Sequence, residues 1–278
     1  MRQLLHYFKL NFLLYLLGRF FFIRHLYKIY KQFISFFVKS SVKNEKHEYV
    51  QWNLADKKVI NDLRKNAVFI GLQLKENILQ DVIRFSKNSK LWSRHERRGF
   101  SDFNEVHRFN KDNQKPCCLL YLTDPKLEKL SNSIARDKNL LRIANNHLGR
   151  VNKIDATVVW SPVCKADDEW RQKQQTIDFH YDVHGLNYLY VFFYITDCDV
   201  ESGAHEMIIG SHAKKDFFEH LIGPARQTRE KLQNFYELEK FVTISGKAGL
   251  GFFEDTSCFH RANAPISSHR LALQFRYS

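Results

Sequence analysis

Four residues in the second half of the chain have the types and spacing of a metal centre: His180, Asp182, His260 and Arg270. In a strand, residues i and i+2 point to the same face, so His180 and Asp182 would present an imidazole and a carboxylate together. Two histidines and one carboxylate on one side of an iron ion leave its other coordination positions open. An arginine nearby can bind a carboxylate ligand through two parallel hydrogen bonds. The pattern predicts a mononuclear non-haem iron site.

Several other side chains could take part in such a site. Arg261 and Arg276 compete with Arg270 for an anionic ligand, although Arg276 lies six residues further along the same strand. Three further histidines flank the proposed ligands, and we interpret them as pocket-lining or structural: His184, His205 and His212. Trp160 and Tyr188 could form pocket walls, but packing in the core explains large aromatic residues equally well.

The order of these motifs resembles the phytanoyl-CoA dioxygenase-like family over roughly residues 65–278. The resemblance rests on His180-x-Asp182, Glu201-Ser-Gly-Ala-His-Glu-Met-Ile-Ile-Gly-Ser-His212, His260-Arg-Ala-Asn263 and Arg270. It implies a double-stranded β-helix with His180, Asp182 and His260 as Fe(II) ligands, and with Arg270 holding 2-oxoglutarate. The chain departs from the family pattern at Ala204 and at Ile208-Ile209, away from the proposed ligands.

The resemblance implies an Fe(II)- and 2-oxoglutarate-dependent dioxygenase. Such an enzyme would form succinate and CO2 and hydroxylate an unactivated C–H bond. The carboxylate of Asp182 favours hydroxylation, because related halogenases have a small residue at that position. The substrate is not encoded in any readable motif, and we expect a small or lipid-linked molecule. Two alternatives are a non-catalytic ligand-binding jelly roll and a nucleic-acid demethylase of the same superfamily.

Positive charge is concentrated at the start of the chain. The formal net charge is +13, and residues 1–44 contain eight Lys and Arg with no Asp or Glu. The other 234 residues therefore carry only +5 (13 − 8), so we expect no nucleic-acid partner. The five cysteines are odd in number and irregularly spaced, which favours a reducing compartment over a disulfide framework.

The N-terminal segment 1–44 is predicted to be a basic, aromatic-rich amphipathic helix ahead of a dioxygenase-like domain, 45–278. Its longest uncharged run near the start, Leu10 to Gly18, is far shorter than the roughly 20 residues of a membrane span. One interpretation is a helix lying in the headgroup region of a membrane. The other is a helix packed on the domain. We therefore expect a cytoplasmic protein, with peripheral contact to the inner face of a membrane as the first interpretation.

The remaining sequence predicts an α+β protein with a jelly-roll core and flanking helices. Short apolar runs broken by turns begin near residue 154 and are typical of antiparallel strands. The clearest is Tyr188 to Thr196, which is rich in β-branched and aromatic residues. Helices are predicted over 75–89, 125–148 and 214–238, and the charged stretch 86–116 is predicted to form loops.

Overall fold

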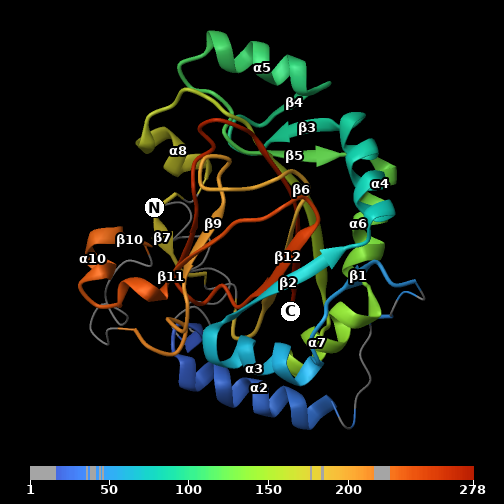
Figure 1. Ribbon diagram of the computed structural model, residues 1–278, viewed down its shortest axis with the longest axis vertical. Helices are drawn as coiled ribbons and strands as arrows, with labels where there is room; N and C mark the ends of the chain where they lie inside the picture. Colours follow the sequence, from blue (N-terminus) through green and yellow to red (C-terminus); the bar gives the residue numbers. More distant parts are fainter. Residues whose placement is uncertain are drawn as a thin grey trace.

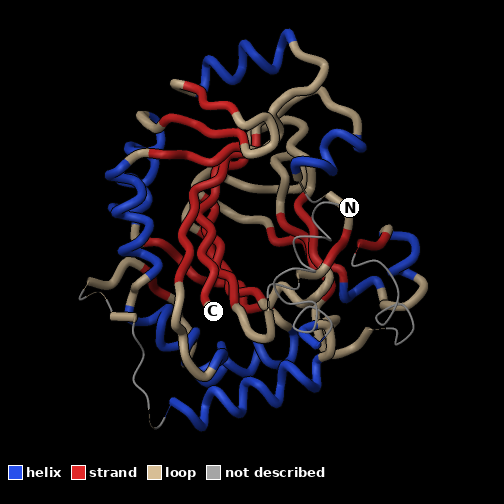
Figure 2. Tube along the Cα trace, turned by 180° about the vertical axis from the view of Figure 1, so that it is seen from behind, coloured by secondary structure: helices blue, strands red, loops and turns tan. Residues whose placement is uncertain are grey.

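Two antiparallel sheets and a set of surrounding helices make up the protein (Figures 1 and 2). The computed structural model describes residues 17–35, 37, 42–43, 45, 47–175, 177–182, 185–215 and 226–278. The α-helices are α2 (Phe21–Ser35), α3 (Asp56–Asn66), α4 (Glu76–Lys87), α5 (Phe103–Asp112), α6 (Pro125–Ala135), α7 (Lys138–Leu148), α8 (Asp168–Gln174) and α10 (Arg229–Gln233). A 3₁₀ turn, η1, spans Leu238–Lys240.

The larger sheet has the strand order β1-β2-β12-β8-β14-β6-β5-β3-β4, and the smaller has the order β10-β7-β13-β9-β11. The larger sheet consists of β1 (Val50–Gln51), β2 (Val68–Leu74), β3 (Lys90–Ser93), β4 (Arg98–Phe100), β5 (Leu120–Thr123), β6 (Ile154–Ser161), β8 (Leu189–Tyr194), β12 (Leu250–Glu254) and β14 (Arg270–Tyr277). The smaller consists of β7 (Phe179–His180), β9 (His205–Ile208), β10 (Arg226–Gln227), β11 (Phe241–Ile244) and β13 (His260–Ala262). The jelly-roll core with flanking helices that the sequence predicts is present.

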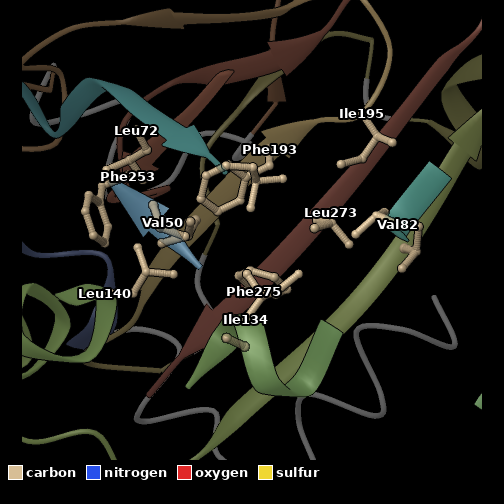
Figure 3. Packing of buried hydrophobic residues seen from close by; sticks show 14 of the residues in the cluster. Val50, Leu72, Val82, Ile134, Leu140, Phe193, Ile195, Phe253, Leu273 and Phe275 are labelled. Carbon is tan, nitrogen blue, oxygen red and sulfur yellow. The ribbon is translucent and has the colours of Figure 1, made fainter. Parts of the chain in front are cut away.

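The two faces of the larger sheet have different roles. Alternate residues of β14, Leu273 and Phe275, join the main apolar core together with Ile134 of α6 and Leu140 of α7 (Figure 3). The alternate residues of β14 on the opposite face point toward the smaller sheet. One of them, Ala272, belongs to a second apolar cluster. The period of two along a strand therefore separates a packing face from a face that can line a site.

Three predicted elements differ from the structure. The stretch 86–116 is not loop alone, since it contains β3, β4 and α5. The predicted helix 125–148 is two helices, because the Asp137 side chain caps the start of α7 by accepting hydrogen bonds from the backbone N–H groups of Asn139 and Leu140. In the predicted helix 214–238, the structure shows β10 and the short α10, and 216–225 lie outside the described residues.

Helix α2 packs against the body of the protein alongside α7 (Figure 1). Its basic side chains Arg24 and Lys28 point inward, and both form ion pairs with Asp255. The described part of the N-terminal segment is therefore packed on the body, and two of its basic side chains are buried instead of lying in water. None of the helices in the described part of the chain has the length and apolar character needed to cross a bilayer.

Candidate metal centre

The structure brings His180, Asp182 and His260 together between neighbouring strands of the smaller sheet. His180 ends β7 and lies directly opposite His260, the first residue of β13. The Asp182 Oδ1 atom is 3.9 Å from His180 Nε2, and its Oδ2 atom is 4.0 Å from His260 Nε2. One potential ligand atom from each residue lies within 4.8 Å of the others. Metal–nitrogen bonds of about 2.1 Å put the two pairs of atoms, His180 with Asp182 and His260 with Asp182, within reach of one ion.

Both histidines turn the same nitrogen toward Asp182. The Nδ1 atom of His180 lies 3.2 Å from the carbonyl oxygen of Asp178, and that of His260 lies 3.0 Å from the carbonyl oxygen of Cys258. A carbonyl oxygen only accepts, so each Nδ1 carries the proton and donates it. Each Nε2 is left with a lone pair facing the aspartate, which is the arrangement of metal-ligating histidines.

Asp182 is fixed through its backbone. Its N–H donates a 2.8 Å hydrogen bond to the carbonyl oxygen of Thr256, and the Tyr188 hydroxyl donates to its carbonyl oxygen. Thr256 belongs to the turn between β12 and β13, and His260 is the first residue of β13. The same turn therefore supports Asp182 and leads into His260. Tyr188 is thus a buried support for Asp182 and does not line the cavity described below.

The electrostatics of the site suit a metal ligand set. Burial, followed by the nearby His260, lowers the pKa of His180 to about 3. The imidazole is therefore neutral at pH 7, and only a neutral imidazole can coordinate a metal ion.

Arg270 faces the same site from the larger sheet. Arg270, Ala272 and Gln274 share one face of β14 and line a cavity of about 260 Å3, whose walls also include His180, Asp182 and His260. The guanidinium is held in place by the Gly203 carbonyl oxygen, which accepts a hydrogen bond from Nη1. At about 30 Å3 per water, the cavity has the volume of roughly nine water molecules, enough for a small dicarboxylic acid.

A glycine is required at residue 203. Its φ is +90°, and a Cβ there would lie 2.8 Å from the Asn263 carbonyl oxygen. This turn places the Gly203 carbonyl oxygen against Arg270. The need for a positive φ at this contact explains why a glycine stands here, between the His180-x-Asp182 segment and His260.

The competing residues lie elsewhere. Arg261 pairs with Glu206 and Arg276 pairs with Asp155, so neither guanidinium lines the cavity. His212 is structural, with Nε2 3.1 Å from the Arg64 carbonyl oxygen. Trp160 packs in the main core. His184 lies outside the described residues.

Sequence reasoning missed a second acidic residue beside the ligands. Glu254 is fully buried at the end of β12, with Oε2 2.8 Å from His205 Nε2, and the His205 ring stacks on His260 with centroids 5.4 Å apart. Burial opposes ionisation of Glu254, but its electrostatic interactions with the His205 and His260 imidazoles outweigh the burial and lower its pKa. Glu254, Cys258 and His260 form a second group with metal-ligand spacing. That group would need His260 Nδ1, which is engaged with the Cys258 carbonyl oxygen.

Two cavity-lining residues carry buried polar atoms with no hydrogen-bond partner among the described residues: Gln175 Oε1 and Thr256 Oγ1. With the neutral His180, the Asp182 carboxylate and the fixed Arg270, the residues present fit a divalent metal and an anionic chelator.

Two solved structures are similar to this chain over most of its length. HygX from Streptomyces hygroscopicus, solved with nickel, 2-oxoglutarate and hygromycin B bound, is similar over 81% of this chain and 87% of that chain, with 9% identity and a TM-score of 0.53. The non-haem alpha ketoglutarate dependent epimerase SnoN from nogalamycin biosynthesis matches 80% of this chain and 82% of its own, with 15% identity and a TM-score of 0.49. The likeness to HygX shows a shared fold. No family model and no curated sequence matches the chain.

Proposed function

We propose that the protein is an Fe(II)- and 2-oxoglutarate-dependent dioxygenase of the phytanoyl-CoA dioxygenase-like type. It hydroxylates an unactivated C–H bond of a small or lipid-linked substrate and releases succinate and CO2. The observation that carries the proposal is that His180, Asp182, His260 and Arg270 come from separate segments and line one cavity. A binding jelly roll without catalysis would have no need for this combination of a three-ligand set and a buried arginine.

Each residue has a defined part in this chemistry. His180, Asp182 and His260 would hold the iron on one side, and bound iron with 2-oxoglutarate would supply the oxidising power. Arg270 binds the distal carboxylate of 2-oxoglutarate and is kept in place by Gly203. Phe192 and Phe252 line the cavity beside these polar groups and give it an apolar wall.

The direct test is succinate formation from 2-oxoglutarate by the full chain with added Fe(II). Asp182→Ala is expected to abolish this turnover while the circular dichroism spectrum stays unchanged. Asp178→Ala is the matched control, because this exposed carboxylate lies two residues from His180 and outside the cavity. Full activity of Asp182→Ala would contradict the metal assignment.

Untargeted mass spectrometry of a lipid and metabolite extract, treated with wild type or with Asp182→Ala, identifies the product. A species one oxygen atom heavier, formed only by wild type, is expected for hydroxylation. A product of unchanged mass would indicate isomerisation instead, and absence of any turnover with every pool would favour a ligand-binding protein.

We also propose that helix α2 contacts a membrane surface, at the cytoplasmic face. The outer side of α2 carries large exposed apolar residues, with Phe22 67% and Phe33 61% accessible, and the stripe consists of Phe22, Leu26, Ile29, Tyr30 and Phe33. At 100° per residue these positions fall within an arc of about 100°. An exposed apolar stripe of this kind is typical of an interaction surface.

The structure changes which side of the helix would meet the bilayer. Five apolar or aromatic residues recur at helical spacing in this segment: Ile23, Tyr27, Tyr30, Ile34 and Phe37. Of these, Tyr30 and Phe37 are exposed, whereas Ile23, Tyr27 and Ile34 are only partly exposed. Arg24 and Lys28 face inward and are neutralised by Asp255, so they are not available to lipid headgroups. Residues 1–16, which precede the helix, contain ten Leu, Phe and Tyr and no acidic residue. The partner that fits this stripe is the apolar phase of a lipid bilayer. The exposed side chains of α2 would bind it mainly by inserting into it.

Flotation of the full chain with phosphatidylcholine vesicles, with and without phosphatidylserine, tests this proposal. We expect binding that persists at high salt and is lost in the triple variant Phe22→Ser, Ile29→Ser, Phe33→Ser. The control variant is Phe235→Ser, Leu238→Ser, Ile266→Ser, which changes exposed apolar residues elsewhere. A dimer that fails to float would instead identify the stripe as a contact between two copies.

A further inference from the structure

A pair of thiols lies outside the metal centre, where two neighbouring strands diverge. β5 and β6 are antiparallel neighbours, with Cys118 just before β5 and Cys164 just after β6. The two Sγ atoms are 3.3 Å apart, and both cysteines are free and buried. A disulfide bond is about 2.05 Å long, so the sulfur atoms need to approach by little more than an ångström to bond.

The two thiols are unequal in access and in chemistry. Cys164 is 9% accessible and lines an open surface cavity of about 1090 Å3, whereas Cys118 is fully enclosed behind it. The hydrogen bond with Cys118, then the charge of Arg171, lower the pKa of the Cys164 thiol. The Arg171 guanidinium is held against this segment because it donates hydrogen bonds to the carbonyl oxygens of Cys164 and Ala166. A thiol at the wall of a surface cavity, with a lowered pKa and a second thiol in contact with it, is the arrangement of redox-active pairs.

We propose that Cys164 and Cys118 form a dithiol site that a peroxide oxidises to an intrachain disulfide. The Cys164 thiolate attacks the O–O bond of the peroxide, an S–O bond forms, and one water leaves after protonation. The Cys118 sulfur then attacks the Cys164 sulfenic acid, so that the S–S bond forms, the S–O bond breaks and a second water leaves. The two thiols lose two electrons and two protons, which convert one hydrogen peroxide into two waters. A thiol reductant reverses the change.

The disulfide would fix one wall of the metal-site cavity. The Cys118 N–H donates a 2.8 Å hydrogen bond to Gln174 Oε1, and Gln175 Nε2 donates to the Cys118 carbonyl oxygen. Both glutamines line that cavity. A Cys118–Cys164 bond therefore ties β5 to the segment that leads into α8, and we expect slower backbone hydrogen exchange in α8 after oxidation.

The test treats the reduced full chain with hydrogen peroxide, then denatures it in excess iodoacetamide and maps the five cysteines by peptide mass spectrometry. We expect two thiols to become unreactive, a cross-linked peptide to appear, and dithiothreitol to restore both. The adjacent cysteine provides a matched control: Cys117→Ser should still form the cross-link, and Cys118→Ser should not.

The wild-type protein alone can overturn the proposal. Five thiols that all remain alkylatable after peroxide, or a Cys164 that ends as sulfinic acid without any cross-link, would show that the contact is only a thiol–thiol hydrogen bond. A cross-link that persists in Cys118→Ser would assign the partner to Cys117. None of these outcomes depends on the proposed enzymatic activity.

Discussion

Arg24 of α2 donates a 2.7 Å hydrogen bond from Nη2 to Oδ1 of Asp255, a residue 231 positions later in the chain. Both side chains are almost fully buried, at 4% and 2% accessible. The Arg24 guanidinium also lies over the Tyr188 ring at 4.9 Å, and Tyr188 donates its hydroxyl hydrogen bond to Asp182. The N-terminal helix thus neutralises a buried carboxylate next to the residues that support the metal centre.

Substitution of Arg24 by Met should destabilise the protein strongly. The methionine keeps apolar bulk but leaves the Asp255 carboxylate with Lys28 at 3.4 Å as its remaining strong counter-charge. Loss of one partner of a buried ion pair costs about 3–5 kcal/mol of the free energy of unfolding. Urea unfolding measures this loss. Lys247→Met, which breaks an exposed pair with Asp197, is the control and should leave stability unchanged.

Truncation should show that α2 belongs to the folded body. A chain starting at residue 17 keeps the Arg24–Asp255 pair and is the reference for urea unfolding. A chain starting at residue 45 loses both Arg24 and Lys28, and we expect it to be at least as unstable as Arg24→Met. Equal stability of the two fragments would instead support 45–278 as an independent domain.

The sequence predicts the jelly roll well, and it selects residues that the fold brings together, because both have local or ordered signals. The run Tyr188 to Thr196 is apolar and β-branched, and it forms β8 as expected. His180-x-Asp182 and His260 are recognisable by their spacing, and the fold places them opposite each other. Arg270 could be selected over Arg276 only by distance along the strand, and in the structure Arg270 lines the cavity whereas Arg276 pairs with Asp155.

Long-range pairing is what the sequence does not encode in a readable form. Asp255 is one of thirty acidic residues, and nothing near it marks it as the partner of a helix at the other end of the chain. The inward orientation of Arg24 follows from that pairing, so a basic side of α2 faces the protein body. The Glu254–His205 contact likewise joins two strands whose own patterns are ordinary. The short strand β3 and the edge strand β4 lack the long apolar runs that identify the central strands.

Arg270→Ala should weaken 2-oxoglutarate binding much more than it weakens metal binding. Hydrogen bonds to charged groups contribute about 1.5–3 kcal/mol, so we expect the dissociation constant of 2-oxoglutarate to rise roughly 10- to 100-fold. Isothermal titration calorimetry of the Mn(II)-loaded protein without oxygen measures this value. Arg276→Ala is the control on the same strand, since its guanidinium pairs with Asp155. Equal effects of both variants would remove Arg270 from the binding site.

Stability should fall as the pH is lowered from about 6.5 to about 4. Burial, then the charge of Lys28, lowers the pKa of His147 to about 4. The geometry agrees, because the ammonium group of Lys28 donates a 2.8 Å hydrogen bond to His147 Nε2, which must therefore lack a proton. In this pH window the unfolded chain binds a proton at the histidine and the folded chain does not, so protons favour unfolding.

The variant His147→Gln isolates this contribution. Glutamine can still accept from Lys28 but does not titrate, so we expect the pH slope of the unfolding free energy to decrease by up to about 1.4 kcal/mol per pH unit. Urea titrations at several pH values measure the slope. His180 and His212 also have lowered pKa values and remain in the variant, so some slope persists. His47→Gln, at an exposed position, should leave the slope as in wild type. An unchanged slope in His147→Gln would mean that His147 is already charged in the folded protein.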